Sequence, residues 1–321
     1  MRVITVGTGK IVREMIKAFK LAGITVHACV SRSLDRAQDF AYSNGVKFYL
    51  SDYDKALTSK NYDTVYIAVP NSLHFEYAKK ALEAGKNVIV EKPICKDSQE
   101  TKKLFEIANM RGLFVFENMT VVHNPITKLI KEDLKLISPV RYIETNFYNK
   151  GSDYDAFIAG ENPPKYSPEY AGGSLMDMNV YNVAFVLELL GMPFSISYHP
   201  RMVRNIDVSG CALLNYGETL CSLNAGKDAN SKNFICITGE KGHIYVNDSP
   251  NRFNTYDVFV DGENSKRRKV NIEDYLSKNA RDFDQIIKEN DYDKYNELVK
   301  TSKNEMKVLD SLRRSGKINF D

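Results

Sequence analysis

The sequence lacks the features that mark membrane, secreted and nucleic-acid-binding proteins. No apolar run approaches the length that crosses a membrane, and the first strand pattern starts too close to the N-terminus for a signal peptide. The formal net charge is only +3 over 321 residues, and the basic run Lys266–Lys269 is typical of a solvated loop or hairpin. We therefore expect a cytoplasmic protein that has neither a membrane nor a nucleic acid as its partner.

Cysteine and histidine are few and scattered. The five cysteines form no Cys-x-x-Cys pair, and the five histidines are equally dispersed. Free thiols buried in a reducing compartment account for the cysteines. Neither residue type shows the grouped spacing of metal ligands, so no metal site is expected.

Residues 1–118 alternate strand and helix patterns, and several of the helix patterns end at a glycine. The expected strands are 3–6, 26–30, 63–69, 87–90 and 113–116. Strands that alternate with helices of this length predict an α/β domain with a parallel, doubly wound Rossmann sheet. A chain of 321 residues exceeds what one hydrophobic core usually serves, so residues 119–321 are expected to form a second domain.

The expected second domain is of the α+β type. Six short alternating runs between residues 196 and 260 suit an antiparallel meander, and hence a large open sheet. The exposed face of such a sheet is large enough to form a homodimer or homotetramer. Residues 149–172 are polar and irregular, which is typical of a site wall. The other predicted elements are a strand over 140–148 and helices beginning at Pro125 and covering 175–190, 274–289 and 293–314.

A Gly-x-Gly turn joins the first strand to the first helix. Glycines at such a turn let the backbone approach a pyrophosphate, which binds at the helix N-terminus. Val12 stands where a third glycine is usual, so a plain strand–helix turn is the alternative interpretation. The predicted cofactor contacts here are Gly7, Thr8, Gly9, Lys10 and Ile11.

The end of the second strand bears on the choice between NADP and NAD. An acid at this place suits the ribose 2′-hydroxyl of NAD, whereas an arginine nearby accommodates the 2′-phosphate of NADP. This chain has Ser31 and Arg32, and its first acid is Asp35. NADP is therefore the preferred prediction over NAD, although Arg32 could equally be an exposed loop cation.

Polar residues follow two more strands of the same expected sheet. Pro70 and Asn71 lead into a helix, where Asn71 can cap the helix N-terminus or contact the nicotinamide ribose. His74, in the first helical turn, is more often structural than catalytic. Glu91, Lys92 and Pro93 end the strand at 87–90, so Lys92 is expected to point at the ligand unless the three form only a surface turn.

A second candidate constellation lies in the apolar helix predicted over 175–190. Asp177 and Tyr181 are four residues apart and therefore share one face. A buried carboxylate requires a partner, and a cation such as Lys92 would supply it. The alternative is that Asp177 only compensates charge at the helix N-terminus and that Tyr181 packs in the core.

Together these motifs resemble the Gfo/Idh/MocA oxidoreductase family, which includes glucose–fructose oxidoreductase, inositol dehydrogenase and dihydrodiol dehydrogenase. The resemblance covers nearly the whole chain, and its specific pair is Glu91-Lys92-Pro93 with Gly172-Gly173-x-x-x-Asp177. It implies a Rossmann NAD(P)-binding domain followed by a substrate-binding and oligomerisation domain. The further motifs that carry it are Gly7-x-Gly9, Ser31-Arg32, Pro70-Asn71-x-x-His74 and Ala81–Lys86.

The resemblance implies hydride transfer between a nicotinamide and a secondary alcohol or ketone carbon of a sugar, polyol or cyclic diol. In this family the matching lysine contacts the reacting hydroxyl, which carries over to Lys92. Tyr181 stands where many members have histidine, as in the branch in which a tyrosine performs the acid–base step. A phenol has a pKa of about 10, and a neighbouring cation would lower it. Asp177 would orient Lys92 or bind a substrate hydroxyl.

Two other functions are compatible with the same fold. A cofactor- or sugar-sensing regulator would keep the fold without catalysis, but its catalytic residues should then be eroded, whereas Lys92, Asp177 and Tyr181 are all present. NAD-dependent inositol-type chemistry is disfavoured by Ser31-Arg32 and by the tyrosine at position 181. The departures from the family at Val12 and Asn179 concern the placement of cofactor and substrate.

Overall fold

The computed structural model describes residues 1–320, which form two compact units. The first unit contains residues 1–119 together with 273–303, and the second contains 120–272 together with the chain from residue 304 onward. Each unit has its own sheet. No helix within residues 1–320 has the length and apolar character needed to cross a membrane.

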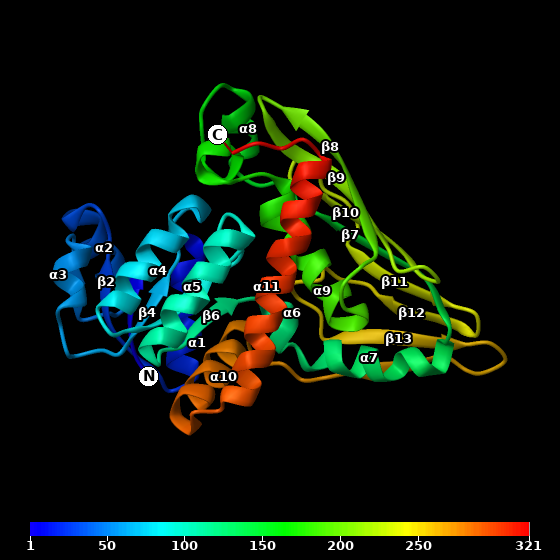
Figure 1. Ribbon diagram of the computed structural model, residues 1–321, viewed down its shortest axis with the longest axis horizontal. Coiled ribbons are helices and arrows are strands. Elements are labelled where there is room, and N and C mark those ends of the chain that lie inside the picture. The colour runs from blue at the N-terminus through cyan, green and yellow to red at the C-terminus, as the bar shows by residue number, and fades with distance from the viewer. Residues whose placement is uncertain (321) are drawn as a thin grey trace. The chain divides into compact units, whose positions relative to one another are not determined.

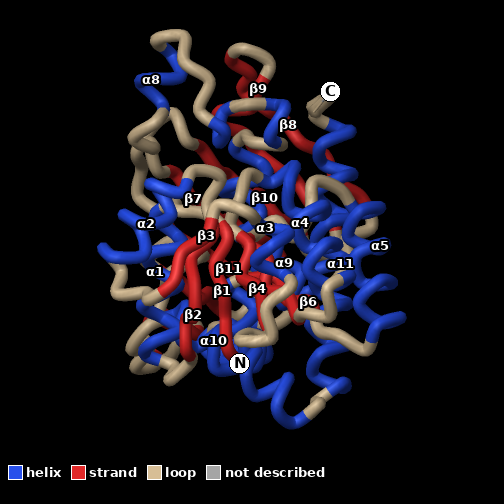
Figure 2. Tube along the Cα trace, turned by 90° about the vertical axis from the view of Figure 1, so that its left-hand side faces the viewer, coloured by secondary structure: helices blue, strands red, loops and turns tan. Residues whose placement is uncertain are grey.

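The first unit is built on a six-stranded parallel sheet in the order β3-β2-β1-β4-β5-β6. Figure 2 shows β2, β1 and β4 side by side. This confirms the predicted doubly wound sheet. Its elements are β1 (Arg2–Val6), α1 (Lys10–Leu21), β2 (Thr25–Val30), α2 (Leu34–Ser43), β3 (Phe48–Leu50), α3 (Tyr53–Leu57), β4 (Thr64–Ile67), a 3₁₀ turn (Asn71–Leu73), α4 (His74–Glu83), β5 (Asn87–Glu91), α5 (Ser98–Arg111) and β6 (Val115–Asn118).

Two features of this unit differ from the expectation. The short elements β3 and α3 were not predicted, because a strand of three residues and a helix of five carry too little periodicity. In addition, α10 (Tyr275–Glu289) and the start of α11 (Tyr292–Ser315) belong to this unit rather than to the second. The Phe283 ring stacks on Phe116 with centroids 4.6 Å apart. An amphipathic helix does not reveal from its sequence which core it covers.

The second unit is built on an eight-stranded, mostly antiparallel sheet in the order β14-β13-β12-β11-β7-β10-β9-β8. Helices α7 and α9 pack on this sheet (Figure 1). The predicted large open sheet is confirmed. Its strands are β7 (Val140–Tyr148), β8 (Ser195–Val203), β9 (Ile206–Asn215), β10 (Leu220–Gly226), β11 (Phe234–Gly239), β12 (Gly242–Val246), β13 (Thr255–Val260) and β14 (Lys266–Lys269), and its helices are α6 (Thr120–His123), α7 (Pro125–Ile137), α8 (Tyr154–Ile158) and α9 (Val180–Leu190).

The strands after α9 do not form the simple meander that was predicted. Strand β7 lies between β10 and β11, and it pairs parallel with β10 and antiparallel with β11. Pairing between strands far apart in the sequence leaves no local turn signal. The basic run is the edge strand β14, in which Arg267 pairs with Asp257 and Arg268 with Asp133. Charges on an edge strand oppose pairing with other chains.

The face of this sheet defined by Tyr142, Leu213 and Leu220 is rich in exposed apolar groups. Tyr142 is opposite Leu220 in the register, and Leu213 is opposite Ser222 on the same face. Their exposed fractions are 38, 44 and 53% respectively. Isolated exposed apolar residues are normal, but several on one sheet face mark a surface suited to an interaction.

Residues 149–172 contain more structure than the sequence predicted. Helix α8 is followed by two 3₁₀ turns, Pro164–Tyr166 and Pro168–Tyr170. The rings of Phe157 and Tyr166 stack with centroids 5.0 Å apart and pack on Ile206 and Val208 of β9. The segment is therefore attached to the sheet by a small apolar cluster of its own.

Candidate functional site

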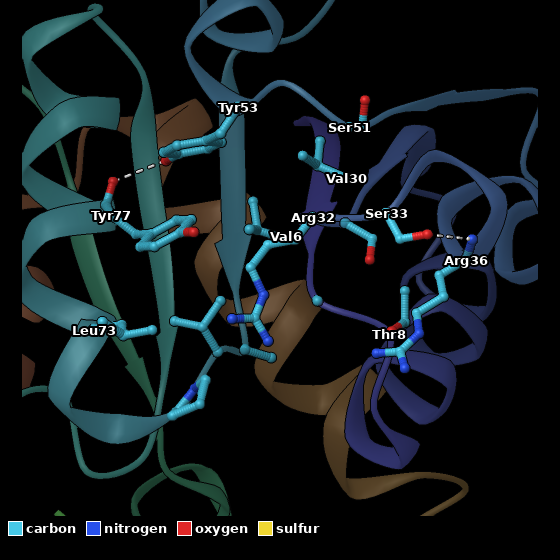
Figure 3. Close-up of a pocket in the computed structure, with 15 residues that line it drawn as sticks. Val6, Thr8, Val30, Arg32, Ser33, Arg36, Ser51, Tyr53, Leu73 and Tyr77 are labelled. Carbon is cyan, nitrogen blue, oxygen red and sulfur yellow. Dashed lines mark hydrogen bonds between the residues drawn. The ribbon is translucent and has the colours of Figure 1, made fainter. Parts of the chain in front are cut away.

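A pocket of about 500 Å³ lies at the carboxyl ends of β1, β2 and β4 in the first unit. Ligands of open α/β sheets bind at this edge, outside the strand ends. Figure 3 shows its lining residues. They include five predicted cofactor residues, namely Gly7, Thr8, Ser31, Arg32 and Pro70, and also Val6, Val30, Ser33, Arg36, Ser51, Tyr53, Ala68, Val69, Leu73 and Tyr77.

The Gly-x-Gly turn leaves open space at the N-terminus of α1. Gly7 has φ of +114°, and a Cβ there would lie 2.4 Å from the carbonyl oxygen of Ala68. Gly9 is the N-cap of α1, where an added Cβ would have no neighbour within 4 Å. Neither a capping side chain nor an acid stands in the first turn of α1. The N-terminal N–H groups of α1 are therefore suited to an anion such as a pyrophosphate.

Two arginines, rather than one, lie at the end of β2. Arg32 was predicted, and Arg36, four residues later in α2, lines the same pocket (Figure 3). Ser33 caps α2 by accepting a hydrogen bond from the amide of Arg36 at 3.4 Å. Arg32 precedes the N-cap of α2, so helical spacing does not relate it to Arg36, and no sequence pattern marked Arg36.

An aromatic pair on the same pocket was also missed. Tyr53 of α3 donates a hydrogen bond to the carbonyl oxygen of Tyr77 in α4 at 2.8 Å. Their ring centroids are 4.9 Å apart. Because α3 itself was not predicted, no sequence signal placed Tyr53 near the end of β2.

His74 connects two of the predicted cofactor segments. Its Nδ1 lies 2.9 Å from the carbonyl oxygen of Pro93, and its Nε2 lies 2.9 Å from that of Val69. The side chain is completely buried, and this burial lowers the pKa of His74 to about 4, against the two carbonyl contacts that raise it. His74 thus holds the chain before Pro70 at a set distance from the turn that follows Lys92.

Glu91 is held inside the sheet. Its Oε1 accepts hydrogen bonds from the hydroxyl of Tyr66 at 2.6 Å and from the amide of Asn118 at 2.7 Å. Burial raises the pKa of Glu91, and the two hydrogen bonds oppose that rise. The side chain therefore anchors the end of β5, the point from which Lys92 and the cis Lys92–Pro93 peptide follow.

Asp177 and Tyr181 are the partly exposed positions of an otherwise buried segment. Asp177 lies in a π-helical turn, Leu175–Asn179, and Tyr181 lies in the first turn of α9. Every other residue from 171 to 187 is buried. π-helical turns are rare and occur frequently at functional sites. The two side chains that reach solvent from this segment are thus a carboxylate and a phenol.

A cation that pairs with Asp177 is Lys227, which was not predicted. Its Nζ lies 2.9 Å from Oδ2 of Asp177. The pairing of Lys92 with Asp177 stays a prediction, made because Lys92 follows the recognisable strand at 87–90. Lys227 follows β10 in the same way, but no motif marks it.

Asn179 and Val12, the two residues that depart from the family pattern, are both buried. The side-chain amide of Asn179 donates to the carbonyl oxygen of Leu223 at 3.1 Å, and its Oδ1 accepts from Asn182 at 2.8 Å. Asn179 therefore joins the π-helical turn to β10. Within residues 1–320, no group of three or more His, Cys, Asp or Glu side chains is arranged to hold a metal ion.

The buried His74 predicts a stability change in acid. Its folded pKa of about 4 lies below the ordinary value of 6.5, so the fold favours the neutral imidazole. The contribution of His74 to the unfolding free energy is complete above the unfolded pKa of 6.5 and is lost as the pH falls from 6.5 towards 4. Between pH 7 and 4.5, the unfolding free energy of the parent protein should fall by about 2–3 kcal/mol more than that of His74→Gln. Urea unfolding of both proteins at the two pH values measures this, and an unchanged decline in the variant would contradict it.

Residues 1–119 match the family model of the Gfo/Idh/MocA oxidoreductases, described as an NAD-binding Rossmann fold. Across the whole chain, scyllo-inositol 2-dehydrogenase (NADP(+)) IolU of Bacillus subtilis is 28% identical over 317 residues, covering 98% of this chain and 96% of that protein. The uncharacterized oxidoreductase YgjR of Escherichia coli is 29% identical over 248 residues, covering 77% of this chain and 76% of its own.

Solved structures show the same fold. KijD10, a 3-ketoreductase from Actinomadura kijaniata in complex with NADP and TDP-benzene, superposes with a TM-score of 0.87 at 24% identity. The alignment covers 98% of this chain and 97% of that one. With its Rossmann unit, its mostly antiparallel second sheet and its matching relatives, this chain belongs to the Gfo/Idh/MocA family of oxidoreductases.

Proposed function

We propose that this chain oxidises or reduces a secondary alcohol or ketone carbon of a sugar, polyol or cyclic diol. The observation that carries the proposal is the pair Asp177 and Tyr181, the partly exposed residues of a buried segment. The first unit would bind the dinucleotide, and the second unit would bind the substrate. We propose residue 118 as the boundary between the two domains, with residues 273–303 added to the dinucleotide-binding domain.

The coarser class is confirmed. Relatives across the family are named dehydrogenases or reductases of sugars and polyols, among them IolU and a D-xylose 1-dehydrogenase (NADP(+)) of Haloferax volcanii. The chain is accordingly an NAD(P)-dependent oxidoreductase, with NADP or NAD as its cofactor. The alternative of a non-catalytic sensor has no support among these relatives.

The bound nicotinamide accepts or donates the hydride, and the protein supplies placement and proton transfer. We propose Tyr181 as the group that takes the proton from the substrate hydroxyl, or returns it to the carbonyl oxygen. Lys92 would bind the reacting oxygen through its ammonium group. Asp177, a carboxylate one turn before Tyr181, would accept a hydrogen bond from a neighbouring substrate hydroxyl.

The acid–base role is tested by Tyr181→Phe, which removes only the hydroxyl. Loss of a general acid–base group typically costs about 10²–10⁴-fold in rate. We expect a fall of this size in kcat for NADP⁺ reduction with scyllo-inositol, myo-inositol or D-xylose, whichever is turned over. The affinity for NADPH, followed by its fluorescence, should stay the same. Tyr245→Phe on β12 is the matched control, and unchanged turnover by Tyr181→Phe would refute the role.

We further propose NADP as the preferred dinucleotide. A 2′-phosphate suits the two guanidinium groups of Arg32 and Arg36, which can each form charge-assisted hydrogen bonds. The first acid after β2 is Asp35, and it is not among the residues that line the pocket. Both the phosphate site and its specificity would therefore depend on two cations rather than on one.

Arg36→Ala tests this preference. A hydrogen bond to a charged group contributes about 1.5–3 kcal/mol, so the Kd for NADPH should rise about 10- to 100-fold. The Kd for NADH should change little, because NADH has no 2′-phosphate. Lys102→Ala on α5, outside the pocket, serves as the control for removing one positive charge. Equal losses for the two dinucleotides would contradict the assignment.

We also propose that the chain forms a homodimer or homotetramer through the face of Tyr142, Leu213 and Leu220. Leu220→Lys places a charge within this face and should shift the mass measured by size-exclusion chromatography with light scattering to that of the monomer. Met110→Lys on α5 replaces another exposed apolar residue, 77% exposed, and should leave the mass unchanged. A monomeric parent protein would refute the proposal.

A further inference from the structure

Lys227 is a buried lysine at the end of β10. Only 3% of the residue is exposed, and its amide donates a hydrogen bond to the carbonyl oxygen of Val208 at 2.7 Å. An ammonium group withdrawn from water is unfavourable unless it is paired and hydrogen-bonded. The partners of the Lys227 ammonium therefore identify the segments that it holds together.

A carboxylate, a carbonyl oxygen and an aromatic ring lie close to the Lys227 ammonium. Its Nζ lies 2.9 Å from Oδ2 of Asp177 and donates to the carbonyl oxygen of Lys165 at 2.8 Å. It also lies 4.3 Å from the centroid of the Tyr166 ring, within the range of a cation–π contact. One cation thus joins the π-helical turn that carries Asp177 to the 3₁₀ turn Pro164–Tyr166.

Further contacts hold the same 3₁₀ turn. The hydroxyl of Tyr166 donates back to the carbonyl oxygen of Lys227 at 3.1 Å. Gly173 donates its amide to the carbonyl oxygen of Lys165 at 3.0 Å, and a Cβ on Gly172 would lie 2.7 Å from that oxygen. The Gly172-Gly173 pair is therefore required for the close packing of this turn against the start of the helical segment.

Lys86 shows how the chain satisfies a buried lysine without a catalytic carboxylate. Its Nζ donates to the carbonyl oxygens of Ser59 at 2.6 Å and Tyr62 at 2.9 Å, and lies 5.0 Å from the Tyr62 ring centroid. Two carbonyl oxygens and an aromatic ring thus lie against this buried ammonium, and the Asp63 carboxylate acts on it at longer range. Lys227 has the same two kinds of partner and Asp177 in addition.

We propose that Lys227 is the positioning residue of Asp177. This proposal rests on the function proposed above. Lys227 holds the Asp177 carboxylate in the orientation that receives a substrate hydroxyl, and it also fixes residues 164–166 beside that carboxylate. A displacement of about 1 Å in such a group can cost about 100-fold in rate. In this role Lys227 affects the reaction through Asp177 and needs no contact with substrate or cofactor.

A double-mutant cycle tests this dependence. Lys227→Met keeps the apolar stem and removes the charge, and we expect it to lower kcat/KM about 100-fold with the substrate that is turned over. In an Asp177→Asn background the same change should have little further effect, because the group that Lys227 positions is already altered. Equal, multiplicative losses in both backgrounds would overturn the proposal.

Two further variants separate positioning from general stability. Lys227→Arg retains a cation and should recover most of kcat/KM, whereas Lys86→Met removes a buried lysine of similar environment and should leave kcat/KM unchanged. If Lys227→Met does not fold, the Lys227→Arg variant decides: activity near that of Asp177→Asn would overturn the proposal.

Failure of this proposal is distinguishable from failure of the proposed function. If Tyr181→Phe abolishes turnover but Lys227→Met does not, the function stands and the positioning role falls. If no sugar or polyol is turned over, urea unfolding of the parent, the two single variants and the double variant still measures the interaction between Lys227 and Asp177. Coupling between Lys227→Met and Asp177→Asn in the unfolding free energy supports the pairing, and additive effects overturn it.

Discussion

The candidate site depends on one physical constraint, which is that polar groups removed from water must find partners inside the protein. His74, Glu91 and Lys227 are all buried, and each is bound by groups on other segments. Glu91 itself ends the strand before Lys92, and the partners of His74 and Lys227 lie in segments that carry other predicted functional residues. Satisfying the buried groups therefore also sets the positions of Lys92 and Asp177.

The two units use this constraint in different ways. In the first, the carboxyl ends of parallel strands meet at one edge, and His74 links two of the loops that leave it. In the second, a single buried cation joins a π-helical turn to a 3₁₀ turn about ten residues earlier in the chain. The pocket at the strand ends is thus placed by sheet topology, whereas the Asp177 carboxylate is held by a local charge pair.

Much of the fold could be predicted because periodic patterns report burial on one element at a time. Such patterns predicted the Rossmann strands, the helical segment 175–190 and most strands of the second sheet. The insertion of β7 between β10 and β11 and the packing of α10 on α1 could not be predicted. Both are contacts between segments far apart in the chain, and no local pattern records them.

The sequence by itself determined the family and the Rossmann domain. It also marked Gly7, Lys92, Asp177 and Tyr181 as candidate site residues, because each of these four belongs to a motif of contiguous or evenly spaced residues. Only the tertiary structure decided which residues accompany them. Arg36, Tyr53 and Lys227 belong to no motif, and they became recognisable only through the pocket they line or the carboxylate they pair with. The reason is physical: a binding site is assembled from side chains that meet in space, and their sequence separation carries no record of that meeting.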